Sequence, residues 1–196
     1  MIPWGKLFKC FFCWGVRSDV QYWKLRKNAY ENKVIVGQSF GQGPGKKPGR
    51  SNEDLAYIAN KLKNYPYVDG MILQFEIADA FSEESKIPPE NFPDENIYVI
   101  REHSTSDKYL DTYEVLRQAK EICDKRGWKK IVILAHPLHQ WRVLMTAKKI
   151  FDEILVAEAE SVAYDKDSVQ WWTRSDIAFI AREISVRLLY LYKGWI

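Results

Sequence analysis

The sequence predicts an α/β fold, a three-layer αβα sandwich built on a mostly parallel, Rossmann-like sheet of about five strands. Two observations lead to this prediction. Short apolar runs rich in Val and Ile recur along the chain, and the segments between them carry apolar residues at helical spacing. Strands that alternate with helices usually form a parallel sheet covered by helices. The length of 196 residues suits one such domain.

Five segments have the composition of buried strands. They are residues 33–37, 71–75, 96–101, 130–135 and 153–157. The fourth, with the sequence KIVILA, is the clearest, and the first ends in a glycine. A short continuous apolar run between turn signals is typical of a strand that is buried on both faces.

Four helices are predicted between and after these strands. The first starts behind Ser51, a good N-cap, with Asp54 at the third helical position. The second begins near residues 111–112 and stops at Gly127, and Pro137 suits the opening of the third. The last is a long C-terminal helix that ends at Gly194. Their apolar stripes are, in order, Leu55, Ile58, Ala59 and Leu62; Tyr109, Tyr113, Leu116, Ala119 and Cys123; Val143, Ala147 and Ile150; and Ile177, Ile180, Ile184, Leu188 and Leu191.

The chain divides into two parts. Residues 1–32 form a basic-aromatic N-terminal flank packed on the domain, and residues 33–196 form the α/β domain, with turn-rich loops expected at 38–50 and 82–95. The apolar stretch 2–16 is too short to span a membrane and lacks the cleavage site of a signal peptide. A helix packed on the domain is favoured for it, and a helix lying on a membrane surface is the alternative. We expect a cytoplasmic protein.

The charge is unevenly distributed although the net charge is only +3. Residues 1–50 contain ten Lys/Arg and two Asp/Glu, whereas residues 51–100 contain three and ten. This asymmetry could steer an anionic ligand to the glycine-rich segment 37–49, or it could reflect solvated surfaces that happen to segregate. The small total and the lack of a recognised binding motif argue against nucleic acid as the partner.

The first predicted strand runs into a glycine-rich loop, residues 38–49, and then into the helix behind Ser51. Glycines such as Gly37 and Gly41 let the backbone approach a phosphate or carboxylate, and the helix N-terminus adds positive potential. The cations of this region are Lys46, Lys47 and Arg50. The spacing does not match a P-loop, because Phe40 stands where the first glycine is needed. The loop is therefore a generic anion-binding candidate, with a flexible surface loop as the alternative.

Carboxylates follow the third predicted strand. Glu102 comes directly after it, and Asp111 precedes the next helix. Either could accept hydrogen bonds from sugar hydroxyls or serve as an acid/base group. Taken alone, each is more often a helix cap or a solvated charge.

The strongest candidate site follows the fourth predicted strand. His136 should end the strand, while His139 and Arg142 are three residues apart and therefore share one face near the helix start. Arginine can bind phosphate bidentately, and a neutral imidazole can shuttle a proton. A capping histidine with a structural arginine ion pair is the alternative.

Metal and redox patterns are weak. His136 and His139 could be two metal ligands, with Glu102 or Asp111 as a third, but nothing fixes that geometry, so we predict no metal site. Cys10 and Cys13 have the CxxC spacing, yet no second pair exists and the motif precedes the first strand. These residues and Cys123 are expected to be small buried apolar side chains.

Several motifs occur in an order that resembles a known family. A strand, a glycine loop and a Ser-x-Glu helix start span residues 34–53, and Glu102 is followed by Ser and Thr. Residues 131–142 then read strand-x-His-x-x-His-x-x-Arg, and 187–195 look like the family's terminal helix. This order resembles the YdcF/SanA/ElyC-like domain family of bacterial α/β proteins, over most of residues 33–195.

The resemblance implies a three-layer αβα fold with a pocket at the strand ends. Its matching positions add pocket candidates, namely Gly37, Ser51, Glu53, Glu102, Asp111, Thr112, His139 and Arg142. One family member is reported to bind S-adenosylmethionine, so the resemblance suggests this ligand. The chain departs from the family at 74–77, where a Ser-Gly-Gly is replaced, in the longer segment 102–112, and in lacking the membrane anchor of the envelope members.

We therefore expect a cytosolic YdcF-like protein that binds a phosphate-bearing or nucleotide-like small molecule in a pocket at the carboxyl ends of the strands. His139 is the candidate acid/base, Arg142 would stabilise negative charge, and Glu102 is a third catalytic candidate. The candidate ligand-binding residues are Gly37, Gly41, Ser51, Glu53, Asp111, Thr112 and His136. Whether a reaction is catalysed stays open.

A non-catalytic interaction module is the alternative function. It is indicated by a surplus of aromatic residues outside the predicted strands, because aromatic anchors are typical of interfaces. These residues are Trp4, Trp14, Trp23, Trp171 and Trp172. Aromatic side chains are equally typical of helix-on-sheet packing, so exposure decides between the two.

Overall fold

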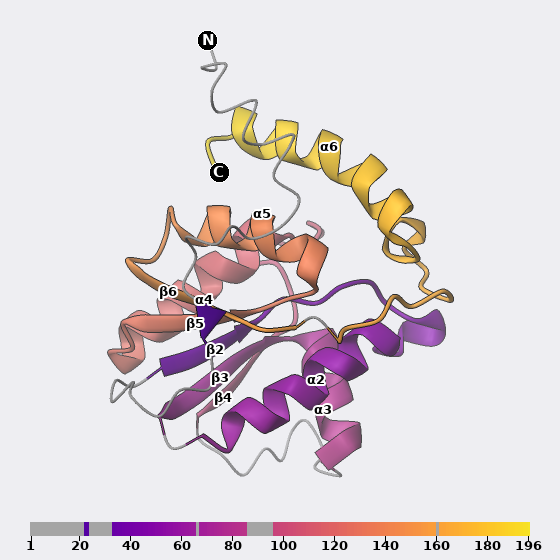
Figure 1. The fold of residues 1–196 in the computed structure, drawn as a ribbon. Coiled ribbons are helices and arrows are strands. Elements are labelled where there is room, and N and C mark those ends of the chain that lie inside the picture. Colours follow the sequence, from indigo (N-terminus) through magenta and orange to yellow (C-terminus); the bar gives the residue numbers. More distant parts are fainter. Residues whose placement is uncertain (1–21, 24–32, 66, 86–95, 160) are drawn as a thin grey trace.

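The computed structural model describes residues 22–23, 33–65, 67–85, 96–159 and 161–196 (Figure 1). The predictions for the N-terminal flank, including its CxxC motif, lie outside the described residues except at Tyr22–Trp23. The predicted loop 82–95 is described only up to Ser85, and this part is helical rather than loop.

The core of the fold is one parallel sheet of six strands in the order β1-β6-β5-β2-β3-β4. The strands are β1 Tyr22–Trp23, β2 Lys33–Gly37, β3 Val68–Gln74, β4 Ile97–Ile100, β5 Lys130–Leu134 and β6 Glu153–Ala157. All five predicted strands are present, and the two-residue β1 adds an edge beside β6. The predicted α/β sandwich is thereby confirmed.

Helices cover both faces of the sheet (Figure 1). They are α2 Arg50–Lys63, α3 Phe75–Ser85, α4 Thr112–Arg126, α5 Pro137–Ala147 and α6 Asp176–Tyr192, with short 3-10 turns η1 Pro44–Lys46 and η3 Trp171–Thr173. One apolar core lies between the sheet and α2 and α3, and a second lies between the sheet and α4 and α5. Because helices cover both faces of the sheet, Val34, Ile35 and Val36 of β2 are completely buried. Cys123 of α4 is also completely buried, as predicted.

The order of the strands creates a crevice beside β2. From β2 the chain proceeds to β3 and β4 on one side, and then returns to place β5 and β6 on the other. The connections that leave the carboxyl ends of β2 and β5 therefore diverge to opposite faces. In open α/β sheets, ligands bind at such a switch point.

The helix starts agree with the sequence at α4 and α5 but not at α2. Asp111 caps α4 by accepting a hydrogen bond from the Glu114 N–H at 3.0 Å, and Pro137 opens α5. Ser51 is not the N-cap of α2, because the helix begins at Arg50 and Gly49 precedes it with φ at +80°. The Ser51 hydroxyl instead donates to a backbone carbonyl 112 residues later, at 2.7 Å.

Gly49, at the start of α2, lies close to the side-chain carboxylate of Asp165. A Cβ at this position would collide with the side chain of Asp165, which is buried. Only glycine combines the positive φ with this close approach. The predicted cap at Ser51 is therefore wrong: Gly49 precedes the helix and makes no side-chain cap.

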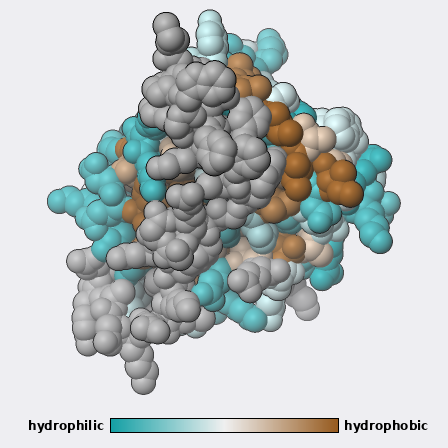
Figure 2. Space-filling model, turned by 45° about the horizontal axis from the view of Figure 1, so that its top comes forward, coloured by the Kyte–Doolittle hydropathy of each residue, from teal (hydrophilic) through white to brown (hydrophobic). Residues whose placement is uncertain are grey.

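The C-terminal helix α6 is present as predicted, but it ends at Tyr192 rather than at Gly194, and three residues of its predicted apolar stripe, Ile177, Ile184 and Leu188, are exposed. Ile177 is 80% exposed and Tyr192 84% exposed. The face turned toward the domain consists of Phe179, Glu183, Arg187 and Tyr190. Figure 2 shows a row of hydrophobic residues on this side of the molecule. Among the described helices, none combines the length and the apolar composition needed to cross a membrane.

Candidate functional site

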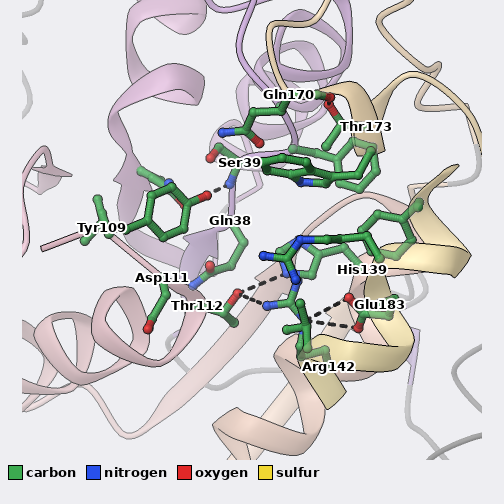
Figure 3. Close-up of a pocket in the computed structure, with 18 of the residues that line it drawn as sticks. Gln38, Ser39, Tyr109, Asp111, Thr112, His139, Arg142, Gln170, Thr173 and Glu183 are labelled. Atoms are coloured by element: carbon green, nitrogen blue, oxygen red, sulfur yellow. Dashed lines mark hydrogen bonds and ion pairs between the residues drawn. The ribbon is translucent and has the colours of Figure 1, made fainter. Parts of the chain in front are cut away.

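A cavity of about 280 Å³ lies at the carboxyl edge of the sheet, next to the switch point between β2 and β5. Its walls come from the segments that follow β2 and β3, the segment before α4, the first turns of α5, and η3 with α6 (Figure 3). The cavity thus joins parts of the chain more than 140 residues apart. Among its lining residues are two arginines, three glutamines and five aromatic side chains.

Arg142, on α5, is held in place by two neighbours. Its Nε donates to both carboxylate oxygens of Glu183, at 3.0 and 3.1 Å, and its Nη1 donates to the Thr112 hydroxyl at 2.9 Å. Figure 3 shows the guanidinium between these two side chains. The guanidinium carbon of Arg142 also lies 5.2 Å from the centroid of the Tyr190 ring, and this cation–π contact holds the side chain further in place. Arg142 is therefore a preorganised cation at the cavity wall.

A second arginine shares the carboxylate of Glu183. Arg187 Nε donates to Glu183 Oε1 at 3.2 Å, and both side chains are about 1% exposed. The Arg187 guanidinium also lies 4.1 Å from the centre of the Trp141 ring. Glu183 thus sits between Arg142 and Arg187 in a buried triad with a net charge of +1, which attaches α6 to α5.

His139 is a neutral ring in this structure. Burial, reinforced by the charge of Arg142, lowers its pKa well below the usual range. Its Nε2 lies 3.1 Å from the Thr112 hydroxyl, which already accepts from Arg142 and can donate its own proton to Nε2. The ring proton is then on Nδ1. His139 and Arg142 are coupled through Thr112, and proton transfer by His139 stays a prediction.

Arg182, on α6, is the second cation that lines the cavity. Its guanidinium lies 5.3 Å from the centroid of the Trp172 ring. In contrast to Arg142, it pairs with no carboxylate in the described part of the chain. Its charge is therefore available to an anionic ligand.

The floor of the cavity carries amide and hydroxyl groups. Gln38 is 1% exposed, and its Nε2 finds no hydrogen-bond acceptor. The backbone N–H of Ser39 donates to Gln74 Oε1 at 3.1 Å. A buried amide N–H without an acceptor is costly unless a ligand or water supplies one. Gln38 is thus an unsatisfied buried donor among the residues that line the cavity.

Five of the predicted site residues line this cavity: Gly41, Asp111, Thr112, His139 and Arg142. They come from three segments that the sequence could only place at the same edge of the sheet. Asp111 contributes as the cap of α4, and its carboxylate points away from Arg142 (Figure 3).

The other predicted site residues do not line the cavity. Gly37 is inside the sheet, where a Cβ would collide with Leu73. Glu102 and Glu53 are exposed, and Ser51 is buried in α2. His136 lies beneath the cavity, buried and neutral.

His136 acts as a structural residue at the end of β5. Its Nδ1 accepts from the Leu138 N–H at 3.4 Å and so caps α5, and its ring stacks on Phe40 with centroids 3.9 Å apart. Burial lowers the pKa of His136 to about 4. The ring therefore stays uncharged at neutral pH and supports Phe40 at the cavity floor.

The basic side chains of the glycine-rich loop do not line this cavity. Lys46, Lys47 and Arg50 are exposed and do not line the cavity, and Arg50 pairs with Asp54 at 3.0 Å. The N-terminus of α2 faces Asp165. The chain's own carboxylate therefore takes the place that a ligand anion would need at this helix.

Sequence reasoning did not assign the wall formed by η3, the residue before it and α6 to the site. This wall supplies nine lining residues: Gln170, Trp172, Thr173, Phe179, Arg182, Glu183, Val186, Leu189 and Tyr190. One signal was available: Glu183 and Arg187 are four residues apart, so an acidic and a basic side chain lie side by side beside the apolar stripe of α6.

Among the described residues, no three His, Cys, Asp or Glu side chains gather in a way that could hold a metal ion. No protein-family model, curated protein or solved structure matches the chain. The functional argument therefore rests on the geometry of the cavity.

Proposed function

We propose that the chain binds a small phosphate-bearing molecule in the cavity at the switch point. The observation that carries the proposal is the pair of guanidiniums, Arg142 and Arg182, on one cavity of about 280 Å³. Guanidiniums bind phosphate oxygens through short, charge-assisted hydrogen bonds. The location agrees with the position where open parallel sheets bind ligands.

The two arginines have complementary roles. Arg142 is fixed by Glu183 and Thr112, so little side-chain entropy is lost when its remaining N–H groups meet a ligand. Arg182 brings a charge that no described carboxylate neutralises. The Gln38 amide supplies a further donor at the floor.

Binding is the activity that this arrangement supports best. His139 has its Nε2 directed at Thr112, and the Asp111 carboxylate caps a helix. The expectation of a YdcF-like protein remains part of the proposal because the predicted strand-end pocket is where that resemblance places the ligand. S-adenosylmethionine, which the resemblance suggests, carries no phosphate and is therefore an alternative to the proposed ligand class.

Replacing Arg182 should weaken phosphate binding with little effect on the fold. We expect Arg182→Ala to raise the Kd at least about tenfold, because a hydrogen bond to a charged group contributes roughly 1.5–3 kcal/mol. Isothermal titration calorimetry with inorganic phosphate, sugar phosphates, nucleotides and S-adenosylmethionine measures this. Arg50→Ala is the matched control, since it removes an exposed arginine from the glycine-rich region.

Three results would contradict this proposal. They are the absence of binding across the panel, equal affinity of Arg182→Ala and the unchanged protein, and loss of binding in Arg50→Ala instead. The last result would move the anion site to the start of α2.

The exposed stripe on α6 favours interaction with another protein as a second candidate function. Ile184, Leu188 and Tyr192 are spaced four residues apart on the exposed face, and Ile177 lies seven residues before Ile184, so the four side chains share one side of the helix. Exposed apolar surfaces of this kind often mark interaction sites. A helix surface with this spacing suits another helix, including α6 of a second copy.

Self-association through α6 is tested by sedimentation equilibrium over a range of protein concentrations. We expect a concentration-dependent dimer that Ile184→Glu abolishes, because a buried unpaired carboxylate is strongly unfavourable. Tyr57→Glu, which places the same charge at an exposed aromatic position on α2, serves as the control. A protein that remains monomeric at every concentration would refute pairing through this surface.

A further inference from the structure

We infer that the ligand carries one flat, unsaturated ring next to its phosphate, so that the preferred ligand class is compact aromatic phosphates. This inference rests on the proposed function and adds the nature of the ligand's uncharged part. Three properties of the cavity support it: its aromatic walls, its size and one orphaned donor.

Aromatic side chains form both the floor and the sides of the cavity. They are Phe40, Tyr109, Trp172, Phe179 and Tyr190. Phe40 and Phe179 are buried and pack together with ring centroids 5.0 Å apart, so they make a rigid floor. Tyr109 is 70% exposed and Trp172 is partly exposed, and these two rings therefore offer accessible faces.

Trp172 and Arg182 form a cation–π pair at one side of the cavity. The guanidinium carbon lies 5.3 Å from the indole centroid, and Trp171 packs against Trp172 at 86°. Indole rings and guanidiniums both stack on unsaturated rings, through quadrupole and cation–π interactions that saturated rings do not offer. Arg182 can thus bind the phosphate while this pair contacts the ring.

The size of the cavity favours a compact ligand. Its volume of about 280 Å³ lies at the small end of the roughly 300–1,000 Å³ that is typical of small-molecule sites. A phosphate and one six-membered ring suit this space better than a base, a ribose and a phosphate together.

Gln38 adds a polar requirement at the ring. Its buried Nε2 has no acceptor, and it belongs to a side chain without charge. An uncharged acceptor on the ligand, such as a ring nitrogen or carbonyl oxygen, would satisfy this donor. This observation is independent of the aromatic walls and also indicates a substituted or heterocyclic ring.

The test compares two phosphates of equal charge and similar size. Calorimetric titration of the full chain with phenyl phosphate and cyclohexyl phosphate should show about fivefold tighter binding of phenyl phosphate, the scale expected of one aromatic contact. Inorganic phosphate should bind more weakly than phenyl phosphate. Adenosine monophosphate should also bind more weakly, because of its size.

Variants at two neighbouring tryptophans show which side chain causes the tighter binding of phenyl phosphate. Trp172→Leu should remove the difference between the two esters, whereas Trp171→Leu, at a 53% exposed position outside the cavity, should keep it. If circular dichroism shows that Trp172→Leu does not fold, the difference in affinity between phenyl phosphate and cyclohexyl phosphate for the unchanged protein tests the inference by itself.

The outcomes separate this inference from the proposed function. Equal affinity for the two esters, or tighter binding of adenosine monophosphate, would overturn the aromatic-ring inference and leave phosphate binding intact. No binding of either ester or of inorganic phosphate would overturn both.

Discussion

Glu183→Gln is expected to lower the free energy of unfolding by about 3–5 kcal/mol, the cost of breaking a buried charge pair. The carboxylate lies between the guanidiniums of Arg142 and Arg187, within 3.2 Å of an Nε of each. Without its charge, Arg142 and Arg187 would both lose the carboxylate that lies between them. Urea denaturation followed by circular dichroism measures the change.

Two control variants show whether this cost comes from the buried triad. Arg187→Met leaves Glu183 paired with Arg142 and replaces the second cation with an apolar side chain, so it should cost clearly less. Lys120→Met breaks an exposed helical pair with Asp124 and should change stability by less than about 1 kcal/mol. A cost below about 1 kcal/mol for Glu183→Gln would show that the triad does not hold α6 on the domain.

Glu76→Gln is expected to stabilise the protein at pH 8 by about 3 kcal/mol and to have little effect at pH 4. Burial raises the pKa of Glu76 from 4.5 to about 7, with a smaller contribution from Asp79, while hydrogen bonds from Ser39 and Gln74 act in the opposite direction. The folded state therefore holds this proton more tightly than the unfolded state. Each unit of pKa difference corresponds to about 1.4 kcal/mol.

The sign of the pH dependence follows from this difference. Between pH 4.5 and about 7 the unfolded chain loses the proton while the folded chain keeps it, so the stability of the protein falls as the pH rises. Above pH 7 the penalty is complete, and glutamine removes it. Urea denaturation at pH 4, 6 and 8 tests this, with the exposed Glu102→Gln as a control. A Glu76→Gln variant that is less stable at pH 8 would refute the expectation.

Local patterns were sufficient for the strands and for several helix ends. The apolar runs at β2 and β5, the αL glycine at position 127 and the proline that opens α5 each act within a few residues. The helix α3 was missed because Phe75 continues the apolar run of β3 without a turn residue between them. Periodicity alone cannot separate a strand from a helix that follows it directly.

The candidate site was only partly predictable for a related reason. Four site residues were predictable because they lie just after strands or at the start of helices, at the carboxyl edge of the sheet where open α/β sheets bind ligands. They are His139, Arg142, Asp111 and Thr112. Glu183 belongs to a helix whose apolar stripe suggested the opposite orientation. Its partner Arg142 is 41 residues away, and no local window contains both.

By itself, the sequence determined the α/β class, the identity of the five main strands and the edge of the sheet at which polar residues collect, because these depend on composition and spacing within each segment. Only the tertiary structure decided the order β4-β3-β2-β5-β6, which places the crevice between the ends of β2 and β5. It also decided that α6 turns Glu183 and Arg187 inward and leaves part of its apolar stripe exposed. The physical reason is that the buried charges of Arg142 and Arg187 need a carboxylate between them, and that requirement arises only when α5 and α6 meet.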